Sequence, residues 1–433
     1  MGIKDFSKAF KACRTIANWN LYKGKIIAID AMTEIWRSAL GAKSVKTLSD
    51  ADNNPTIHIN VIMANIIKMQ KSGVKTIWVF DHDQDGSCTE HHIAAKSDEV
   101  AERRKKRAEA KAKIEDLEKE EPLFSDDDSD DESKDNKDSE KQAILDKQTN
   151  KQAILDKQTN KQAIQQTIQQ QEKRAFCVSK EMINDIKFIL TCLNISYVEA
   201  PASFEGEHLA AYFTSSEVGL ADAVYSGDTD PIPFGAPILL RKNPRDKKIY
   251  EYRQTDILDQ IHEVIGDDYD YPTIDDIRKI CAILGSDYSK RTKGIGAKTV
   301  LRKYKVIKLA ADQKTAISEF EKIPDISDIT VHNNQYEAFT NTNVDLLVDW
   351  LVNNKSFAKS RVLKWIEDVM EKNEQGVWTV KEIKTNTKSV KTKTSTKNVK
   401  TKSSTKSVKT KTKRTASPEV PLKISERRQQ AKN

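Results

Sequence analysis

The sequence predicts an α/β fold in which a parallel central sheet is flanked by helices. Short apolar runs typical of buried strands occur near 25–30, 74–80, 195–199, 222–226 and 237–241. Segments whose apolar residues have helical spacing lie among them, at 58–73 and 179–192. Alternating strands and helices favour a parallel sheet that is covered on both faces.

The chain divides into an N-terminal half at 1–97, an insertion at 98–175, an internal half at 176–375 and a tail at 376–433. The insertion starts with helix formers of mixed charge. It continues with an acidic run of net charge −7 at 125–140 and two tandem copies of KQAILDKQTN. We expect a solvated helix followed by a disordered spacer, because so polar a segment buries too little apolar surface to fold.

The tail is strongly basic, with a net charge of +12 at 384–414 and no acid in that range. Its lysines recur in a repeated TKSVKTKTS-type unit, which predicts disorder and non-specific binding to polyanions, or a nuclear address. The alternative is a tail that only improves solubility. The whole chain carries only +7, so any basic surface on the folded part must be local.

The Lys-, Asn- and Ile-rich repeats indicate an AT-rich genome, such as that of a microbe or a large DNA virus.

Five cysteines are widely spaced and form no C-x-x-C pair, which argues for a reducing compartment and against a disulfide framework. The N-terminus lacks the apolar core of a signal peptide, and no stretch reaches membrane-spanning length. We therefore expect an intracellular protein that is neither secreted nor membrane-bound.

Seven carboxylates occur in five short motifs, several of which follow a predicted strand. They are Asp30 in IIAIDA, Asp81 in WVFDH, Glu205 and Glu207 in EGE, Asp228 and Asp230 in SGDTD, and Asp287 in LGSDY. Side chains at strand ends open into one crevice. So many acids share a small space only if divalent cations neutralise them. Each motif alone is weak, because a D-x-D is often a surface loop and a single Asp often caps a helix.

Carboxylate oxygens in such numbers suit Mg²⁺, which prefers hard ligands and keeps several waters. Two Mg²⁺ ions roughly 3.5–4 Å apart supply a nucleophilic hydroxide and stabilise the leaving oxygen of a phosphodiester. The predicted cofactor is therefore a pair of Mg²⁺ ions, with Mn²⁺ as a substitute.

The motifs AIDA, VFD, APASFEGEHLAAY, SGDTDPIPFG and ILGSDYSKRTKGIGAK, in this order, resemble the flap endonuclease and XPG-type 5′ nucleases. The resemblance covers about 1–120 and 175–305. It implies a PIN-like 5′ nuclease core built from the two halves, a helical arch in the insertion and a helix-two-turn-helix. It assigns the metal-binding role to the seven carboxylates.

The resemblance implies further site residues. Lys96 and Arg103 match the catalytic cations at the base of the family's arch, and Gly2 lies in a family-like start, MGIKDF, near the scissile region. Trp36 matches an aromatic residue that stacks on a nucleotide. The alternatives are a solvated helix face for the two cations and a core position for Trp36.

The turn with Gly294, Gly296 and Lys298 resembles the helix-two-turn-helix that grips duplex DNA through backbone N–H groups and holds a K⁺ ion. The alternative is an ordinary Gly-rich turn. Three departures from the family are the insert HDQDGSCTEHH after VFD, two extra residues in APASFEGE, and Pro231 and Pro233 after SGDTD. The insert is a polar loop or a second metal cluster.

The resemblance predicts a structure-specific 5′ nuclease for branched DNA with a 5′ single strand, in replication or repair. It would act as a monomer in the nucleus or at sites of DNA replication. No clamp-docking motif is present in the tail, so a sliding clamp is not predicted as a partner. The alternatives are a 5′ exonuclease, a junction or RNA nuclease, and a catalytically silent nucleic-acid scaffold of the same fold.

Overall fold

The computed structural model describes residues 2–40, 49–52, 54–82, 97–120, 159, 161–202, 204–327, 329–332, 341–372, 374, 376 and 378–380. The acidic run, the tandem repeats apart from residue 159, and the Lys-rich tail at 384–414 lie outside these described residues. So do Lys96 and most of the insert after VFD. The predictions made for those segments remain predictions.

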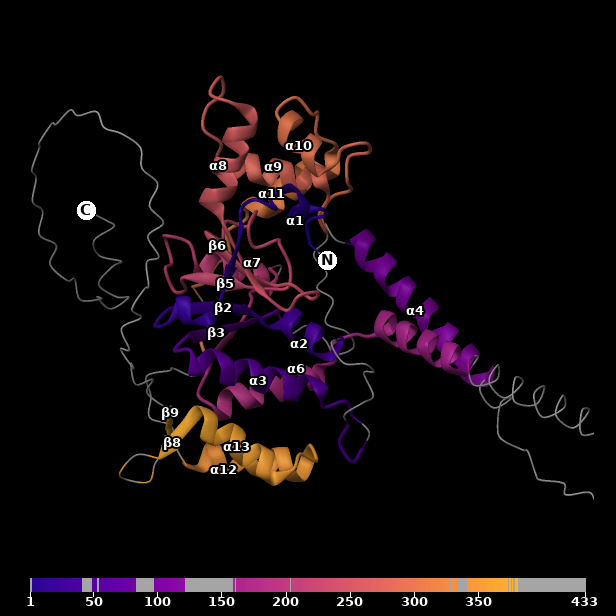
Figure 1. Ribbon diagram of the computed structural model, residues 1–433, viewed down its shortest axis with the longest axis vertical. Coiled ribbons are helices and arrows are strands. Elements are labelled where there is room, and N and C mark those ends of the chain that lie inside the picture. The colour runs from indigo at the N-terminus through magenta and orange to yellow at the C-terminus, as the bar shows by residue number, and fades with distance from the viewer. Residues whose placement is uncertain are drawn as a thin grey trace, which may run out of the picture. The chain divides into compact units, whose positions relative to one another are not determined.

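A seven-stranded sheet, ordered β1-β7-β6-β5-β2-β3-β4, forms the centre (Figure 1). Its strands are β1 (Arg14–Ala17), β2 (Ile26–Asp30), β3 (Lys75–Phe80), β4 (Ser196–Glu199), β5 (Ala223–Tyr225), β6 (Ile238–Lys242) and β7 (Ile249–Arg253). The five strands from β6 to β4 run parallel, so the predicted parallel central sheet is confirmed.

Two antiparallel strands that the sequence argument missed, β7 and β1, extend one edge. A six-residue connection at 243–248 joins β6 to β7, with Lys247 at a positive φ of 59°. So short a link permits a hairpin but not a parallel crossover, which needs a dozen or more residues. The sheet is therefore mixed at this edge.

The helices cover both faces of the sheet (Figure 1). Those of the described residues are α1 (Phe6–Ala9), α2 (Ala31–Leu40), α3 (Ile57–Lys71), α4 (Ser97–Glu120), α6 (Lys180–Cys192), α7 (Gly206–Phe213), α8 (Gln254–Ile265), α9 (Ile274–Leu284), α10 (Ala297–Lys303), α11 (Ala311–Glu321), α12 (Asn341–Asp349) and α13 (Lys359–Val369). Residues 161–175 are helical as well, so the disordered spacer expected to end at 165 is wrong for residues 161–165.

An apolar core lies on each face of the sheet. Ile27 and Ile29 of β2 face the core under α2, α3, α6, α12 and α13, whereas Ala28 faces the core under α1 and α7 to α11. Alternate residues of a strand point to opposite faces, so a strand buried on both sides is apolar throughout. This explains why IIAI precedes Asp30 without a polar interruption.

The helices predicted at 58–73 and 179–192 are confirmed as α3 and α6, and the solvated helix expected at the start of the insertion is confirmed as α4. The segment at 341–372 contains α12, a π-helical turn at Trp350–Asn354, α13 and then strand β8 (Met370–Lys372), which pairs with β9 (Trp378–Val380). None of the described helices is long and apolar enough to cross a membrane.

The cysteines differ in state. Cys13, Cys192 and Cys281 are buried free thiols, and burial raises the pKa of Cys13 and Cys192 to about 12. Cys177 is disulfide-bonded, which departs from the reducing environment that the cysteine spacing favours, although one such cysteine makes no disulfide framework.

Candidate active site

Four of the carboxylates lie at the carboxyl ends of neighbouring parallel strands. Asp30 ends β2, Asp81 directly follows β3, Glu205 follows the loop after β4, and Asp228 lies three residues beyond β5. Because these strands are adjacent in the order β5-β2-β3-β4, their ends share one edge of the sheet. Sites in open α/β sheets form at this edge, where the strand order reverses.

A serine hydroxyl joins two of these strand ends. Ser226 Oγ donates to Asp30 Oδ2 at 2.6 Å and accepts from the Asp228 backbone N–H at 2.9 Å. Thr33 Oγ1 donates to the same Asp30 oxygen at 2.6 Å. These bonds fix the side chains of Asp30, Ser226 and Thr33 relative to one another. Asp30 is only 3% exposed.

The EGE motif contacts the end of β3 and the LGSDY loop. The Gly206 N–H donates to Asp81 Oδ1 at 2.7 Å, and Tyr288 Oη donates to Glu205 Oε2 at 2.8 Å. Glu205 immediately precedes α7 and Glu207 lies in its first turn. The two extra residues in APASFEGE therefore leave the glutamate pair at the sheet edge.

The start of the chain lies against the SGDTD loop. The Ile3 N–H donates to Asp230 Oδ1 at 3.0 Å and lies 3.1 Å from Thr229 Oγ1. Gly2 has a φ of +82°, and a Cβ built on it would lie 1.5 Å from Asp228 Oδ1 and 2.9 Å from Asp230 Oδ1. Only a glycine fits between the backbone and these two carboxylates.

A Gly2→Ala variant is expected to lose cleavage by about 10²-fold, because the added Cβ displaces the Asp228 carboxylate and small misplacements at a reacting centre are costly. Single-turnover cleavage of labelled 5′-flap DNA measures the loss. Gly24→Ala is the matched control, since Gly24 has a φ of +77° but no atom within 4 Å of its Cβ position. Equal losses in both variants would assign the effect to backbone strain instead.

Asp287 is paired with the predicted arch cation. Arg103 Nη2 of α4 donates to Asp287 Oδ2 at 2.6 Å, and this places Arg103 at the acidic edge. Lys96, the other predicted arch cation, lies outside the described residues.

The buried acids repel one another. Burial, and then the charge of Asp287, raises the pKa of Asp228 to about 6, although other neighbours lower it. Burial is also the main cause of a raised pKa at Asp30, where hydrogen bonds from Ser226 and Thr33 oppose it and the charge of Glu205 adds to it. A cation placed among these groups would relieve the repulsion of Asp228 by Asp287 and of Asp30 by Glu205.

Among the described residues, no three His, Cys, Asp or Glu side chains form a ready-made metal-ligand group. Several carboxylate oxygens face donors of the protein, such as Ser226, Gly206 and Arg103. The donor set still fits Mg²⁺, because it consists of carboxylate oxygens, several of them buried and mutually repelling. The seven carboxylates remain a proposed metal site.

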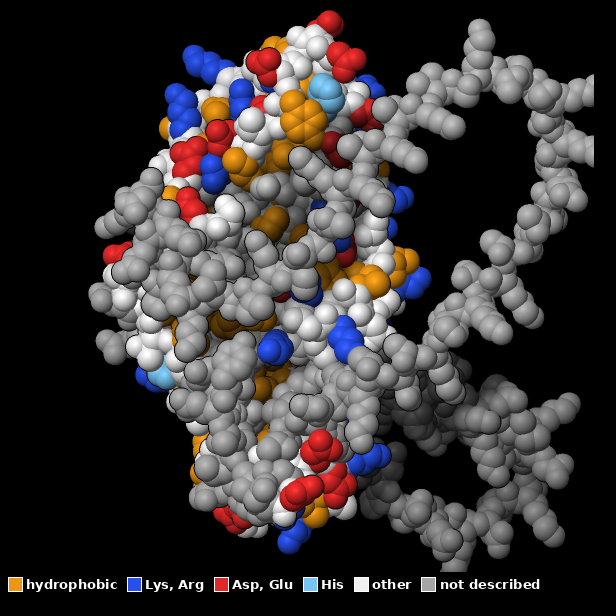
Figure 2. Space-filling view, turned by 90° about the vertical axis from the view of Figure 1, so that its left-hand side faces the viewer, with side chains coloured by type: hydrophobic (Ala, Val, Ile, Leu, Met, Phe, Trp, Pro, Cys, Tyr) orange, Lys and Arg blue, Asp and Glu red, His pale blue; other side chains and the backbone are white. Residues whose placement is uncertain are grey.

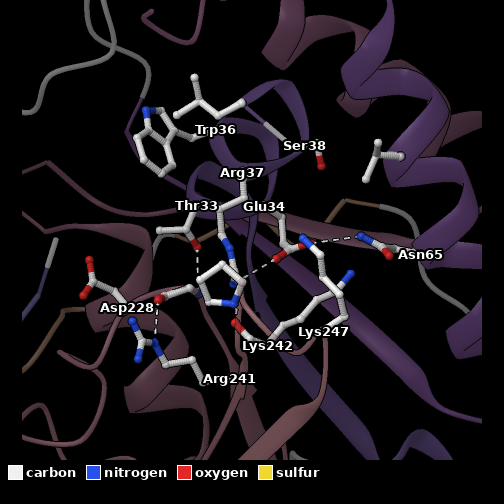
Figure 3. Close-up of a pocket in the computed structure, with 14 residues that line it drawn as sticks. Thr33, Glu34, Trp36, Arg37, Ser38, Asn65, Asp228, Arg241, Lys242 and Lys247 are labelled. Atoms are coloured by element: carbon white, nitrogen blue, oxygen red, sulfur yellow. Dashed lines mark hydrogen bonds and ion pairs between the residues drawn. The ribbon is translucent and has the colours of Figure 1, made fainter. Parts of the chain in front are cut away.

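A cavity of about 490 Å³ opens beside Asp228. Trp36 of α2 lines it together with Arg37, Arg241 and Lys242 (Figure 3). Trp36 also packs, partly buried, against the core under α2. Its role in stacking on a nucleotide stays a prediction. Lys247 lines the cavity as well, and the four cations outnumber its two acids, Glu34 and Asp228, so the cavity is attractive to an anion.

The predicted helix-two-turn-helix consists of α9, the turn at 285–296 and α10. Gly294 has a φ of +76°, which favours glycine, and Gly296 is the residue before the first turn of α10. Lys298 is exposed, as are three further cations of the turn, Lys290, Arg291 and Lys293. This local basic surface contrasts with the face in Figure 2, where acidic and basic side chains are interspersed.

Family models match both halves of the chain. The XPG N-terminal domain matches residues 1–110, and the XPG I-region matches residues 194–287. The chain thus contains the N-terminal and internal regions of the XPG nuclease family. The two matched regions contain all seven carboxylates and Arg103.

Curated relatives are flap endonucleases. Flap endonuclease 1 of Heterostelium pallidum is 26% identical over 401 residues, covering 88% of each chain. Flap endonuclease 1 of Yarrowia lipolytica is 27% identical over 391 residues, covering 84% of this chain and 86% of its own.

Solved structures of this family share the fold. Flap endonuclease-1 from Methanococcus jannaschii aligns with a TM-score of 0.52 at 19% identity, over 82% of this chain and 94% of that one. The catalytic core of Rad2 in complex with a DNA substrate aligns with a TM-score of 0.50 at 14% identity, over 86% of this chain and all of its own.

Residues outside the family motifs also shape the site. Thr33 holds Asp30, Arg241 Nε donates to the Gly227 carbonyl at 2.7 Å, and the Arg241 charge lowers the pKa of Asp228. Ser226 lies in SGDTD and Tyr288 in LGSDY, but the sequence did not show which carboxylate each of them contacts. Nothing in the sequence indicated that Arg241, at the end of an apolar strand, contacts the site.

Proposed function

We propose that this chain is a structure-specific 5′ nuclease that hydrolyses phosphodiesters in branched, 5′-flap-like DNA. One observation carries the proposal. Carboxylates at the ends of four adjacent parallel strands are held in place by shared contacts at one sheet edge. Family membership supports the same reaction.

In this proposal, 1–97 and 176–375 are the two nuclease halves and 98–175 is the arch insertion. Two Mg²⁺ ions, replaceable by Mn²⁺, would be held by the seven carboxylates and supply a hydroxide nucleophile and a counter-charge for the leaving oxygen. Arg103 would donate to the scissile phosphate, and Trp36 would stack on a nucleotide beside Asp228. The protein would act in DNA replication or repair.

The turn at 285–296 would bind the duplex on one side of the branch, with a K⁺ ion beside Gly294 and Gly296. Its exposed cations and the N-terminus of α10 support this role, because backbone N–H groups at a helix start favour phosphate. Binding through the phosphate backbone would select DNA by shape rather than base sequence.

A labelled 5′-flap DNA with Mg²⁺ tests the proposal. We expect cleavage near the branch, faster than on a 3′-flap, a blunt duplex, a bubble or a flap made of RNA. Faster cleavage of duplex ends, bubbles or RNA would favour the exonuclease, junction or RNA nuclease. Binding without cleavage in both Mg²⁺ and Mn²⁺ would favour the silent scaffold and overturn the proposal.

A Lys298→Gln variant should weaken duplex binding equally for all sequences. Loss of one phosphate contact lowers the slope of log K against log salt concentration by about 1. Fluorescence anisotropy at several salt concentrations measures the slope. The control is Lys364→Gln, which removes an exposed lysine of α13. An unchanged slope in Lys298→Gln would exclude a phosphate contact at this position.

A further inference from the structure

The guanidinium of Arg37 lies against the loop that carries Asp228 and Asp230. A Cβ built on Gly227 would be 2.7 Å from Arg37 Cδ and 3.1 Å from its Nη1. The Arg37 side chain therefore covers the Gly227 Cα, one residue before Asp228. Arg37 belongs to α2, which begins directly after Asp30. The same helix therefore follows one proposed metal ligand, Asp30, and contacts the loop of another, Asp228.

Arg37 is itself held by the end of β6 and by Glu34 of its own helix, which α3 contacts in turn. Its Nη2 donates to the Lys242 carbonyl at the end of β6, and its Nη1 lies 3.8 Å from Glu34 Oε1. Glu34 is only 4% exposed, and its other oxygen accepts from Asn65 Nδ2 of α3 at 3.1 Å. A buried carboxylate persists where it is paired and hydrogen-bonded, so this network fixes the guanidinium in one position.

A second guanidinium holds the same glycine from another direction. Arg241 Nε donates to the Gly227 carbonyl at 2.7 Å, and Arg241 Nη1 donates to Ser7 Oγ at 3.0 Å. The Gly227 N–H donates to Thr33 Oγ1 at 3.3 Å. The side chains of Arg37 and Arg241 reach the loop beside Asp228 in Figure 3. Gly227 is thus restrained at its N–H, its Cα and its carbonyl.

We propose that Arg37 is a positioning residue that fixes the SGDTD loop, and with it the Asp228 carboxylate, for metal binding. It acts through Gly227 and does not touch the reacting atoms. The inference rests on the proposed function, because it assigns Arg37 to the metal site of that reaction. Groups that orient metal ligands in this way tune metal affinity strongly.

Arg37→Met is the main variant, since it keeps the length of the side chain but loses its charge and hydrogen bonds. We expect DNA-free protein to bind Mn²⁺ about 10-fold more weakly, measured by calorimetry, as is typical when a group that orients metal ligands is lost. The Mg²⁺ concentration that half-saturates cleavage should rise in parallel, while KM for flap DNA stays unchanged. Arg37→Lys, which keeps the charge and one donor, should recover part of the affinity.

Gly227→Ala changes the contact between Gly227 and Arg37 at its other partner. Its Cβ would push Arg37 away, so this variant should weaken Mn²⁺ binding as well, and the double variant Gly227→Ala/Arg37→Met should be no weaker than Arg37→Met alone. Additive losses would overturn the proposal, because they show that the two residues act separately. Arg361→Met, at an exposed position of α13, is the control for loss of an arginine.

Three outcomes separate the possibilities. A raised KM for DNA with unchanged Mn²⁺ affinity would make Arg37 a DNA contact and overturn the positioning role. Equal melting temperatures with weaker Mn²⁺ binding would support it, since a loss of folding is then excluded. Wild-type protein that cuts no branched DNA would refute the proposed function alone, and the Mn²⁺ comparison would still decide the role of Arg37.

Discussion

An Asp228→Asn variant is expected to cut 5′-flap DNA about 10³-fold more slowly, because several kcal/mol of transition-state stabilisation depend on metal ions held by charged oxygens. Asparagine keeps the size and hydrogen-bonding shape of the buried side chain but removes its charge. Affinity for branched DNA should persist. Single-turnover cleavage in Mg²⁺ and anisotropy in Ca²⁺ measure the two properties.

Asp268→Asn is the matched control, since Asp268 is exposed and lies away from the SGDTD loop in sequence. We expect this variant to cut at the wild-type rate. Cleavage by Asp228→Asn within about twofold of wild type would contradict the metal role, because a lost metal ligand costs far more.

The Asp228→Asn variant should also be more stable than the wild type when divalent cations are absent. Burial and the charge of Asp287 raise the pKa of Asp228 from 3.8 to about 6, so above that pH the folded protein carries an unfavourable charge that asparagine lacks. As the pH falls through about 6 the folded wild type takes up a proton. The difference in melting temperature should therefore be largest above about pH 7 and shrink on acidification.

Replacing Arg103 with glutamine is expected to slow flap cleavage by about 10²-fold, as is typical for loss of a donor to the developing charge. Arg103 Nη2 lies 2.6 Å from Asp287 Oδ2, so it also competes with a cation for that carboxylate. DNA-free Arg103→Gln should accordingly bind Mn²⁺ more tightly than the wild type. Single-turnover kinetics and calorimetry measure these opposite effects.

Arg361→Gln serves as the control and should change neither property. Slower cleavage with unchanged Mn²⁺ affinity would limit Arg103 to a contact with the substrate phosphate. A normal cleavage rate would exclude the arch role altogether.

The acidic edge of the sheet was predictable because local patterns encode it. An apolar run that is buried on both faces predicts a parallel strand, and a carboxylate at the end of such a run predicts a place at the carboxyl edge. Asp30 after IIAI and Asp81 after WVF follow this rule, and both lie where it places them. The amphipathic spacing of α3 and α6 was equally readable.

The hairpin edge was harder to predict. β7 has the sequence IYEYR, in which polar and aromatic residues are mixed, and its pairing with β6 follows from the short turn at 243–248. The short link and its turn residues were the available signal, since they exclude a parallel crossover. β1 shows an exposed edge pattern that no periodicity argument separates from a loop.

The sequence alone therefore determined the sheet edge where Asp30 and Asp81 lie, since a strand and the carboxylate that ends it are close together in the chain. The metal-binding role of the seven carboxylates stays a prediction. Only the tertiary structure decided how the acids are held. Ser226 is 196 residues from Asp30, the Ile3 N–H is 227 residues from Asp230, and Arg37 meets Gly227 across two elements. Such contacts depend on how the elements pack in space, and no local spacing records them.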